Sequence, residues 1–157
     1  MDADAVRNLQ KLVDLEEIRA LKHRYAELCD DGYDGAKIAA LFAPDAVWDG
    51  GMFGRYEGRE KIRDHFNTSD RAVPFAIHLL SNELIEVDGD RATASWLLWE
   101  PMVFARNDQA IWMSARYRDT YRRIDGKWMF QTVTINVQMF SPYETGFGRQ
   151  LLTELPR

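Results

Sequence analysis

The sequence has little cysteine, proline and histidine, and it contains no long uninterrupted apolar run. Its single cysteine, Cys29, excludes an intramolecular disulfide, so we expect a reducing compartment and a cytoplasmic location. No stretch approaches the roughly 18 apolar residues that a membrane-spanning helix needs, so no membrane partner is expected. Residues 1–4 are acidic and lack the basic start and apolar run of a signal peptide.

An excess of basic residues is also missing. The 20 Lys and Arg residues are outnumbered by 25 Asp and Glu residues, which gives a net charge of −5. The most basic stretch, residues 116–123, is interrupted by Asp119, so we expect no nucleic-acid partner. His23, His65 and His78 show no metal-binding spacing, and His23 and His65 are expected at exposed or half-buried helix positions. We therefore predict no metal site.

The composition of the chain predicts one globular domain over residues 1–157. Hydrophobic residues make up 46% and charged residues 29% of the chain, a globular balance. Leucines and isoleucines at intervals of three or four predict a long helix over 4–30, with charged residues such as Lys22 on its polar side. Two shorter helices are predicted at 34–42, ended by Pro44, and at 58–69.

After residue 72 the apolar period changes from near 3.6 to 2, which predicts β-strands. A short strand is expected earlier, at 46–48. The four long strands are predicted at about 73–87, 91–105, 110–124 and 127–140. Helices followed by an antiparallel meander indicate an α+β fold, in which the helices cover one face of a curved sheet around an apolar pocket.

Several polar residues fall on apolar strand faces. Glu100 shares a face with six apolar residues of the second long strand, so it either has a partner, lines a pocket or is turned outward by a bulge. His78 lies among small and apolar neighbours of the first long strand. It is either a functional residue or a buried histidine with a purely structural role. Asp119 is expected to pair with a neighbouring arginine. Asn136, on the last strand, is expected either to bind a ligand or to face solvent.

A recognisable pattern is formed by four segments and one aspartate: residues 15–25, 41–48, 58–62 and 117–128, and Asp30. They are similar to the SnoaL-like branch of the nuclear-transport-factor-2-like superfamily. This resemblance implies a cone-shaped fold, in which helices pack on a strongly curved, mostly antiparallel sheet that encloses a pocket. It also implies a homo-oligomer, either a dimer or a trimer. The superfamily contains both enzymes and non-catalytic proteins, so the fold alone does not assign a function.

Within the superfamily, the sequence most resembles the group of bile-acid 7α-dehydratase, scytalone dehydratase and hexachlorocyclohexane dehydrochlorinase. These enzymes use an Asp–His dyad, and Asp30 and His78 match its two positions. Tyr25 matches a tyrosine five residues before that aspartate, and Glu100 falls where the bile-acid enzyme has an aspartate. Cys29 departs from scytalone dehydratase, which has a tyrosine directly before its aspartate.

The resemblance implies a cofactor-independent dehydratase, another lyase or an isomerase that acts on a small hydrophobic ring molecule. His78 would be the general base, Asp30 its orienting partner and Tyr25 a hydrogen-bond donor to substrate. A polyketide-cyclase-like enzyme and a non-catalytic ligand-binding or subunit-assembly protein are the alternatives. The expected substrate-binding residues are Trp48, Trp96, Met102, Phe104, Met113, Phe130 and Asn136.

Overall fold

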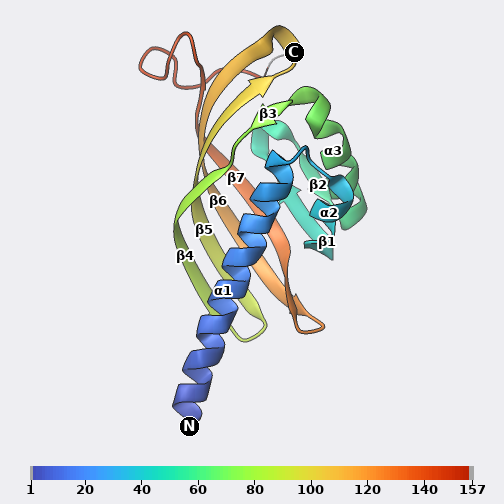
Figure 1. The fold of residues 1–157 in the computed structure, drawn as a ribbon, viewed down its shortest axis with the longest axis vertical. Coiled ribbons are helices and arrows are strands. Elements are labelled where there is room, and N and C mark those ends of the chain that lie inside the picture. The colour runs from blue at the N-terminus through green and yellow to red at the C-terminus, as the bar shows by residue number, and fades with distance from the viewer. Residues whose placement is uncertain (1, 156–157) are drawn as a thin grey trace.

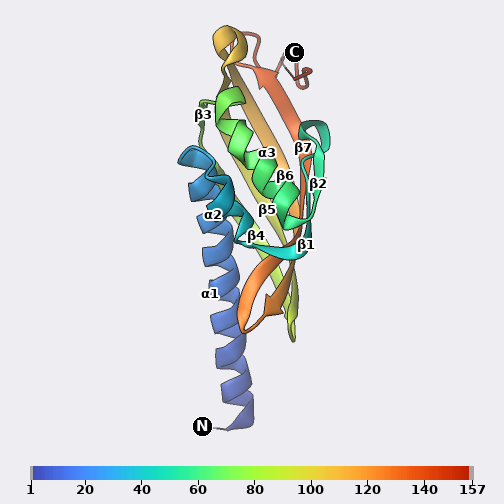
Figure 2. The same cartoon turned by 90° about the vertical axis from the view of Figure 1, so that its right-hand side faces the viewer.

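A computed structural model describes residues 2–155, and its helices lie across one face of a curved sheet (Figure 1). The helices are α1 (Ala3–Asp30), α2 (Gly35–Ala39) and α3 (Arg59–Ala72). Asp2 caps α1 by accepting a 2.7 Å hydrogen bond from the Ala5 N–H, as expected for an acidic N-cap. The α+β class predicted from the sequence is confirmed, and Figure 2 shows the three helices together on one side of the strands.

The sheet has seven strands within residues 2–155, in the order β2-β1-β7-β6-β5-β3, with β4 also pairing to β5. Among these seven strands of the described residues, β1 and β7 pair in parallel and the other pairs are antiparallel. The predicted four-stranded meander was therefore incomplete. The strands are β1 (Phe42–Asp49), β2 (Arg55–Glu57), β3 (Phe75–Ala76), β4 (Leu79–Asp88), β5 (Arg91–Phe104), β6 (Gln109–Ile124) and β7 (Lys127–Pro142).

The predictions for residues 34–48 need correction. The second helix ends at Ala39 and not at residue 42, and β1 begins at Phe42 and not at residue 46. Pro44 lies inside β1, at a register shift between Phe42 and Val47. A proline is tolerated there because an irregular part of the ladder does not need its missing N–H.

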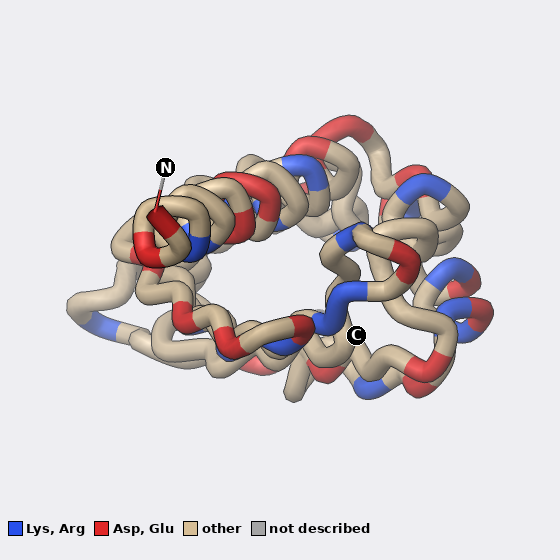
Figure 3. The backbone as a smooth tube through the Cα atoms, turned by 90° about the horizontal axis from the view of Figure 1, so that it is seen from below, with Lys and Arg blue, Asp and Glu red and all other residues tan. Residues whose placement is uncertain are grey.

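Bulges between β6 and β7 bend the sheet and decide which residues face inward. Tyr121 pairs with Phe130 and Thr120 pairs with Thr132, so Gln131 is an extra residue in β7. Phe130 and Ile135 are consequently both buried although they differ by an odd number of positions. The resulting curl is visible in Figure 3, where α1 lies along the open side of the sheet and acidic and basic segments alternate.

Helix α1 is only partly covered by the sheet. Its first turns project beyond the strands in Figure 1, and Leu9 and Leu12 of the predicted apolar stripe are exposed. From Ile18 onward the helix faces the core. Between residues 2 and 155, no helix is long and apolar enough to cross a membrane.

The core under α1 contains an ion pair that the sequence did not predict. Lys22, expected on the polar side of the helix, has a fully buried side chain, and its Nζ lies 2.9 Å from Oδ2 of Asp119. The predicted arginine partner of Asp119 was therefore wrong. Nζ also lies 3.3 Å from the centroid of the Tyr117 ring, and the Tyr121 hydroxyl donates to Asp119 at 3.0 Å. Charge pairing, a cation–π contact and a hydrogen bond together offset part of the cost of burial.

Candidate active site

Three elements bring Asp30, His78 and Glu100 together. Asp30 is the last residue of α1, and Glu100 lies in the middle of β5. His78 lies in a break between β3 and β4, which corrects the continuous strand predicted over 73–87. Because the ladder is interrupted there, the His78 backbone N–H donates to both oxygens of Asp30, at 3.0 and 3.1 Å. The break thus fixes the position of the histidine against the end of α1.

The imidazole of His78 lies between two carboxylates. Its Nδ1 is 2.6 Å from Oδ1 of Asp30, and its Nε2 is 3.4 Å from Oε1 of Glu100. The short contact assigns the proton on Nδ1 and leaves Nε2 facing Glu100. The side chains of His78 and Glu100 are only 7% and 5% exposed, whereas that of Asp30 is 29% exposed. The inner pair is therefore shielded from water, and Asp30 links it to the surface.

The surroundings raise the pKa values of both His78 and Glu100, for different reasons. Burial alone lowers the pKa of His78, but the facing Glu100 and the hydrogen bond to Asp30 outweigh burial and raise it above its usual value. Burial raises the pKa of the Glu100 carboxyl, and the positive form of His78 offsets part of that rise. Both groups therefore hold a proton more strongly than they would in water, and their 3.4 Å separation places them within reach of each other.

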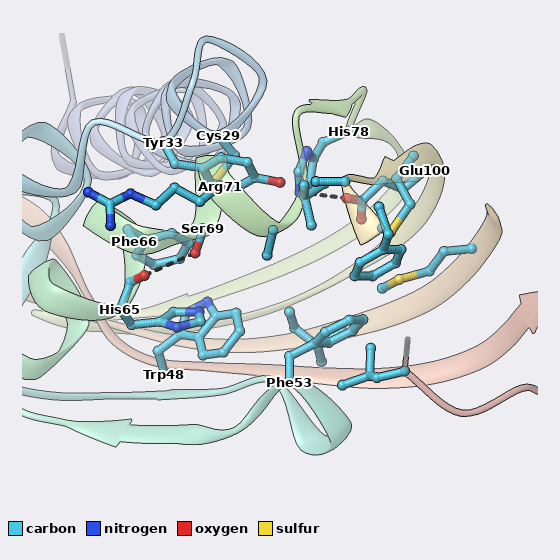
Figure 4. A pocket seen from close by; sticks show the side chains of 18 of the residues that line it. Cys29, Tyr33, Trp48, Phe53, His65, Phe66, Ser69, Arg71, His78 and Glu100 are labelled. Carbon is cyan, nitrogen blue, oxygen red and sulfur yellow. Dashed lines mark hydrogen bonds and ion pairs between the residues drawn. The ribbon is translucent and has the colours of Figure 1, made fainter. Parts of the chain in front are cut away.

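His78 and Glu100 line a cavity of about 380 Å³, a size suited to a small ligand (Figure 4). Most of its other walls are apolar or aromatic. The residues predicted for substrate binding that line it are Trp48, Met102, Phe104 and Met113. Tyr25 also lines this cavity, whereas Asp30 contacts it through His78.

Three other residues predicted for substrate binding lie outside the cavity lining. Trp96 is buried in the core, where its indole N–H donates to the Tyr121 hydroxyl at 3.2 Å. Phe130 is also a core residue, and it contacts Tyr121 with ring centroids 5.2 Å apart. Asn136 is exposed because the extra residue Gln131 in β7 reverses the two faces of the strand beyond it. Ile135 lines the cavity instead.

Tyr25 is enclosed more tightly than a freely available hydrogen-bond donor would be. Its hydroxyl accepts a 2.9 Å hydrogen bond from the Trp48 indole N–H. Its ring makes edge contacts with Phe42, Phe66 and Phe130, among others. Burial raises the pKa of Tyr25 well above its usual value, so the phenol keeps its own proton.

Sequence reasoning missed His65 as a cavity residue. Its ring stacks on Tyr56 at 4.1 Å and lies 4.8 Å from that of Trp48, on the wall opposite His78 (Figure 4). Burial lowers the pKa of His65 to about 4, so the imidazole is neutral near pH 7. The spacing of Ile62, His65 and Phe66 placed all three on one helix face, and that signal was available in the sequence.

Tyr33, just beyond the end of α1, was also missed. Its phenol lines the cavity, and its hydroxyl points toward His78 in Figure 4. Cys29 lines the cavity too, but burial raises the pKa of its thiol well above the usual value, which disfavours the thiolate. In the described part of the chain, no group of three or more His, Cys, Asp or Glu residues is placed to hold a metal ion.

Comparison with known proteins gives the family of this fold. The SnoaL-like domain family matches residues 10–134. An uncharacterized protein of Mycobacterium tuberculosis is 30% identical over 127 residues, which is 77% of this chain and 83% of the relative.

Solved structures share the fold of this chain. A hexachlorocyclohexane dehydrochlorinase of type 2 superposes with a TM-score of 0.81 at 24% identity, covering 86% of this chain and 92% of the enzyme. The dehydrochlorinase from Novosphingobium barchaimii gives 0.78 at 23% identity, covering 96% and 99%. A proposed scytalone dehydratase from Novosphingobium aromaticivorans gives 0.77 at 19% identity, covering 94% and 96%. At these identities the likeness establishes a common fold, and the match of the family model over residues 10–134 shows that this chain belongs to the SnoaL-like domain family.

Proposed function

We propose that the protein is a lyase that removes water or a halide from a small hydrophobic ring compound. The observation that carries this proposal is the row Asp30–His78–Glu100, whose two inner members, His78 and Glu100, are shielded from water on the wall of an apolar cavity. A histidine oriented by one carboxylate and facing a second, protonatable one supplies a base and an acid at the same place. The solved dehydrochlorinases and the proposed scytalone dehydratase with this fold support the same class of reaction.

The reaction begins with proton abstraction. Neutral His78 takes a proton from a substrate carbon with Nε2, while its Nδ1–H donates to Asp30. The negative charge of Asp30 stabilises the imidazolium that forms. The electron pair of the broken C–H bond becomes the new carbon–carbon double bond. General base action of this kind typically accelerates a reaction about 10²–10⁴-fold.

Departure of the leaving group completes the elimination. When a hydroxyl leaves, the C–O bond breaks and the oxygen takes the proton of Glu100, so water is released. His78 then returns the substrate proton from Nε2 to Glu100 across the 3.4 Å that separate them. When a halide leaves, it departs as an anion and the proton on Nε2 passes to solvent. If the leaving group is absent and the proton returns to another carbon, the same groups perform an isomerisation.

A substrate screen followed by substitutions tests the proposal. Hydroxylated and halogenated ring compounds would be incubated with the protein, and halide release or absorbance of the new double bond would be recorded. We expect His78→Ala to abolish turnover and Asp30→Asn and Glu100→Gln to reduce kcat strongly, with unfolding temperatures near that of the original protein. His23→Ala, which alters an exposed histidine of the same helix as Asp30, is the matched control and should retain full rate.

Two results would contradict the proposal. Full activity of His78→Ala on an identified substrate would exclude the histidine as base and favour a cyclase that relies on one carboxylate. Tight binding of ring compounds without conversion of any of them would instead indicate a non-catalytic ligand-binding protein. Calorimetric titration beside the activity screen separates these cases.

A further inference from the structure

Tyr33 adopts a backbone conformation that an aromatic residue rarely takes. Its φ is 58°, directly after Gly32 with a φ of 85°. Left-handed backbone is strained for a non-glycine residue, so it persists only where the surroundings enforce it. Here the Tyr33 N–H donates to the Leu28 carbonyl at 3.1 Å and closes the end of α1. The turn sends the phenol into the cavity and not toward solvent.

The phenol of Tyr33 is held in place at its ring but not at its hydroxyl. The ring stacks on Phe66 with centroids 6.2 Å apart and planes 13° apart. The hydroxyl makes no hydrogen bond to any residue between 2 and 155, and it points toward His78 in Figure 4. Burial, followed by the nearby acidic groups Glu100 and Asp30, raises the pKa of Tyr33 far above its usual value. The group is therefore a fixed, protonated donor without a partner.

Tyr25 differs from Tyr33 in each of these respects. Its hydroxyl already accepts the Trp48 N–H, and aromatic edges surround its ring. Its place in the structure is that of a core residue whose edge reaches the cavity wall. The resemblance to the dehydratases pointed to Tyr25 as the donor to substrate, but the free hydroxyl beside the Asp–His pair belongs to Tyr33.

We propose that Tyr33 is a catalytic hydrogen-bond donor that holds the leaving atom, or the polarised carbonyl oxygen, of the substrate beside His78 and Glu100. This inference rests on the elimination proposed above. Tyr33 donates a hydrogen bond as negative charge grows on the leaving atom, and it transfers no proton, because Glu100 supplies the proton for water. The substrate class follows: an apolar ring compound with one acceptor atom close to the carbon that loses its proton.

The test compares Tyr33→Phe with Tyr25→Phe, since each change removes one hydroxyl and keeps the ring. With a substrate from the screen, we expect Tyr33→Phe to lower kcat by about 100- to 1000-fold, the range for loss of one donor to developing negative charge. The loss should be larger for a poor leaving group than for a good one. Tyr25→Phe should lower kcat less and show no dependence on the leaving group.

A binding measurement tests the same donor without turnover. The probes are 1-tetralone, whose carbonyl only accepts hydrogen bonds, and tetralin, which has the same rings without oxygen. The original protein should prefer 1-tetralone, and Tyr33→Phe should reduce that preference by about 2- to 10-fold, as expected for one neutral hydrogen bond. Tyr25→Phe should keep the preference.

The failure of this inference can be distinguished from failure of the proposed function. If His78→Ala is inactive while Tyr33→Phe retains full rate and the full preference for 1-tetralone, the elimination stands and the role of Tyr33 is wrong. If His78→Ala retains full rate, the elimination mechanism itself is wrong. A loss in Tyr33→Phe that is equal for all leaving groups and leaves the preference for 1-tetralone unchanged would indicate a structural role.

Discussion

The buried pair of Lys22 and Asp119 allows a quantitative prediction. Both side chains are 0% exposed, and Nζ and Oδ2 are 2.9 Å apart. Removing one partner of a buried pair leaves an uncompensated charge and typically costs about 3–5 kcal/mol. We therefore expect Lys22→Met to lower the free energy of unfolding by that amount. For a domain of this size the change corresponds to a fall of about 6–20 °C in Tm, at roughly 2–4 °C per kcal/mol.

A double replacement separates the charge from the packing. Lys22→Met combined with Asp119→Leu removes both charges and leaves an apolar contact under Tyr117. The Tyr121 hydroxyl loses its acceptor, which costs about 1 kcal/mol. The double variant should therefore be more stable than Lys22→Met alone. Urea unfolding followed by circular dichroism measures the free energy of unfolding of the original protein, of Lys22→Met and of the double variant. Arg24→Met, which breaks an exposed pair with Glu27, is the matched control and should cost less than about 1 kcal/mol.

The deficit of Lys22→Met should depend on pH in a defined direction. Burial already raises the pKa of Asp119, and Lys22 opposes that rise, so its removal raises the pKa further. A carboxyl with a raised pKa in the folded state binds its proton more strongly there than in the unfolded chain. The variant thus loses stability as pH rises and regains part of it in acid. An unchanged urea midpoint at pH 7, or a deficit that grows toward pH 5, would falsify this account of the pair.

Three further predictions follow from buried groups. The imidazole of His65 should titrate near pH 4 by NMR, because burial lowers its pKa, and a titration near 6.5 would place it in solvent. The Cys29 thiol should react slowly with a disulfide reagent at pH 8 and rapidly in urea, because burial raises its pKa; equal rates would contradict that burial. Trp48→Phe removes the donor to the Tyr25 hydroxyl and should lower the free energy of unfolding by about 1–3 kcal/mol, measured by urea unfolding. Trp112→Phe, at a half-buried ring, should cost less, and an equal cost for both would argue against a significant contribution from the buried hydrogen bond.

Alternation predicted the site where the strands are regular. Strand β5 runs without a register shift against β6, so no bulge turns Glu100 outward and its side chain is buried, which decides between the alternatives that the sequence left open. The place of Asp30 at the end of the first helix was equally accessible, because residue 30 closes a long apolar period before a glycine turn. The apolar periodicity of a regular helix or strand predicts which way such residues face, and this prediction needs no information about their partners.

The remaining features depend on contacts that no local pattern contains. Asn136 faces solvent because one extra residue in β7 reverses the faces of the strand. His78 lies outside the strand ladder because the chain is irregular between β3 and β4. Lys22 looks like a surface residue because its partner lies almost a hundred positions later in the chain. Tyr33 reaches the cavity through a backbone conformation that the sequence around it does not signal.

The parallel pairing of β1 with β7 has a consequence for the order in which the protein folds. β1 carries Trp48, a wall of the cavity, yet apart from the short β2 its strand partner is the last long strand of the chain. Contacts between such distant segments form slowly, because a long loop must close before any of them is gained. During synthesis, which proceeds from the N-terminus, this wall has no sheet to join until β7 has emerged from the ribosome. The ligand cavity is therefore completed late, and a chain that ends before β7 would lack one of its walls.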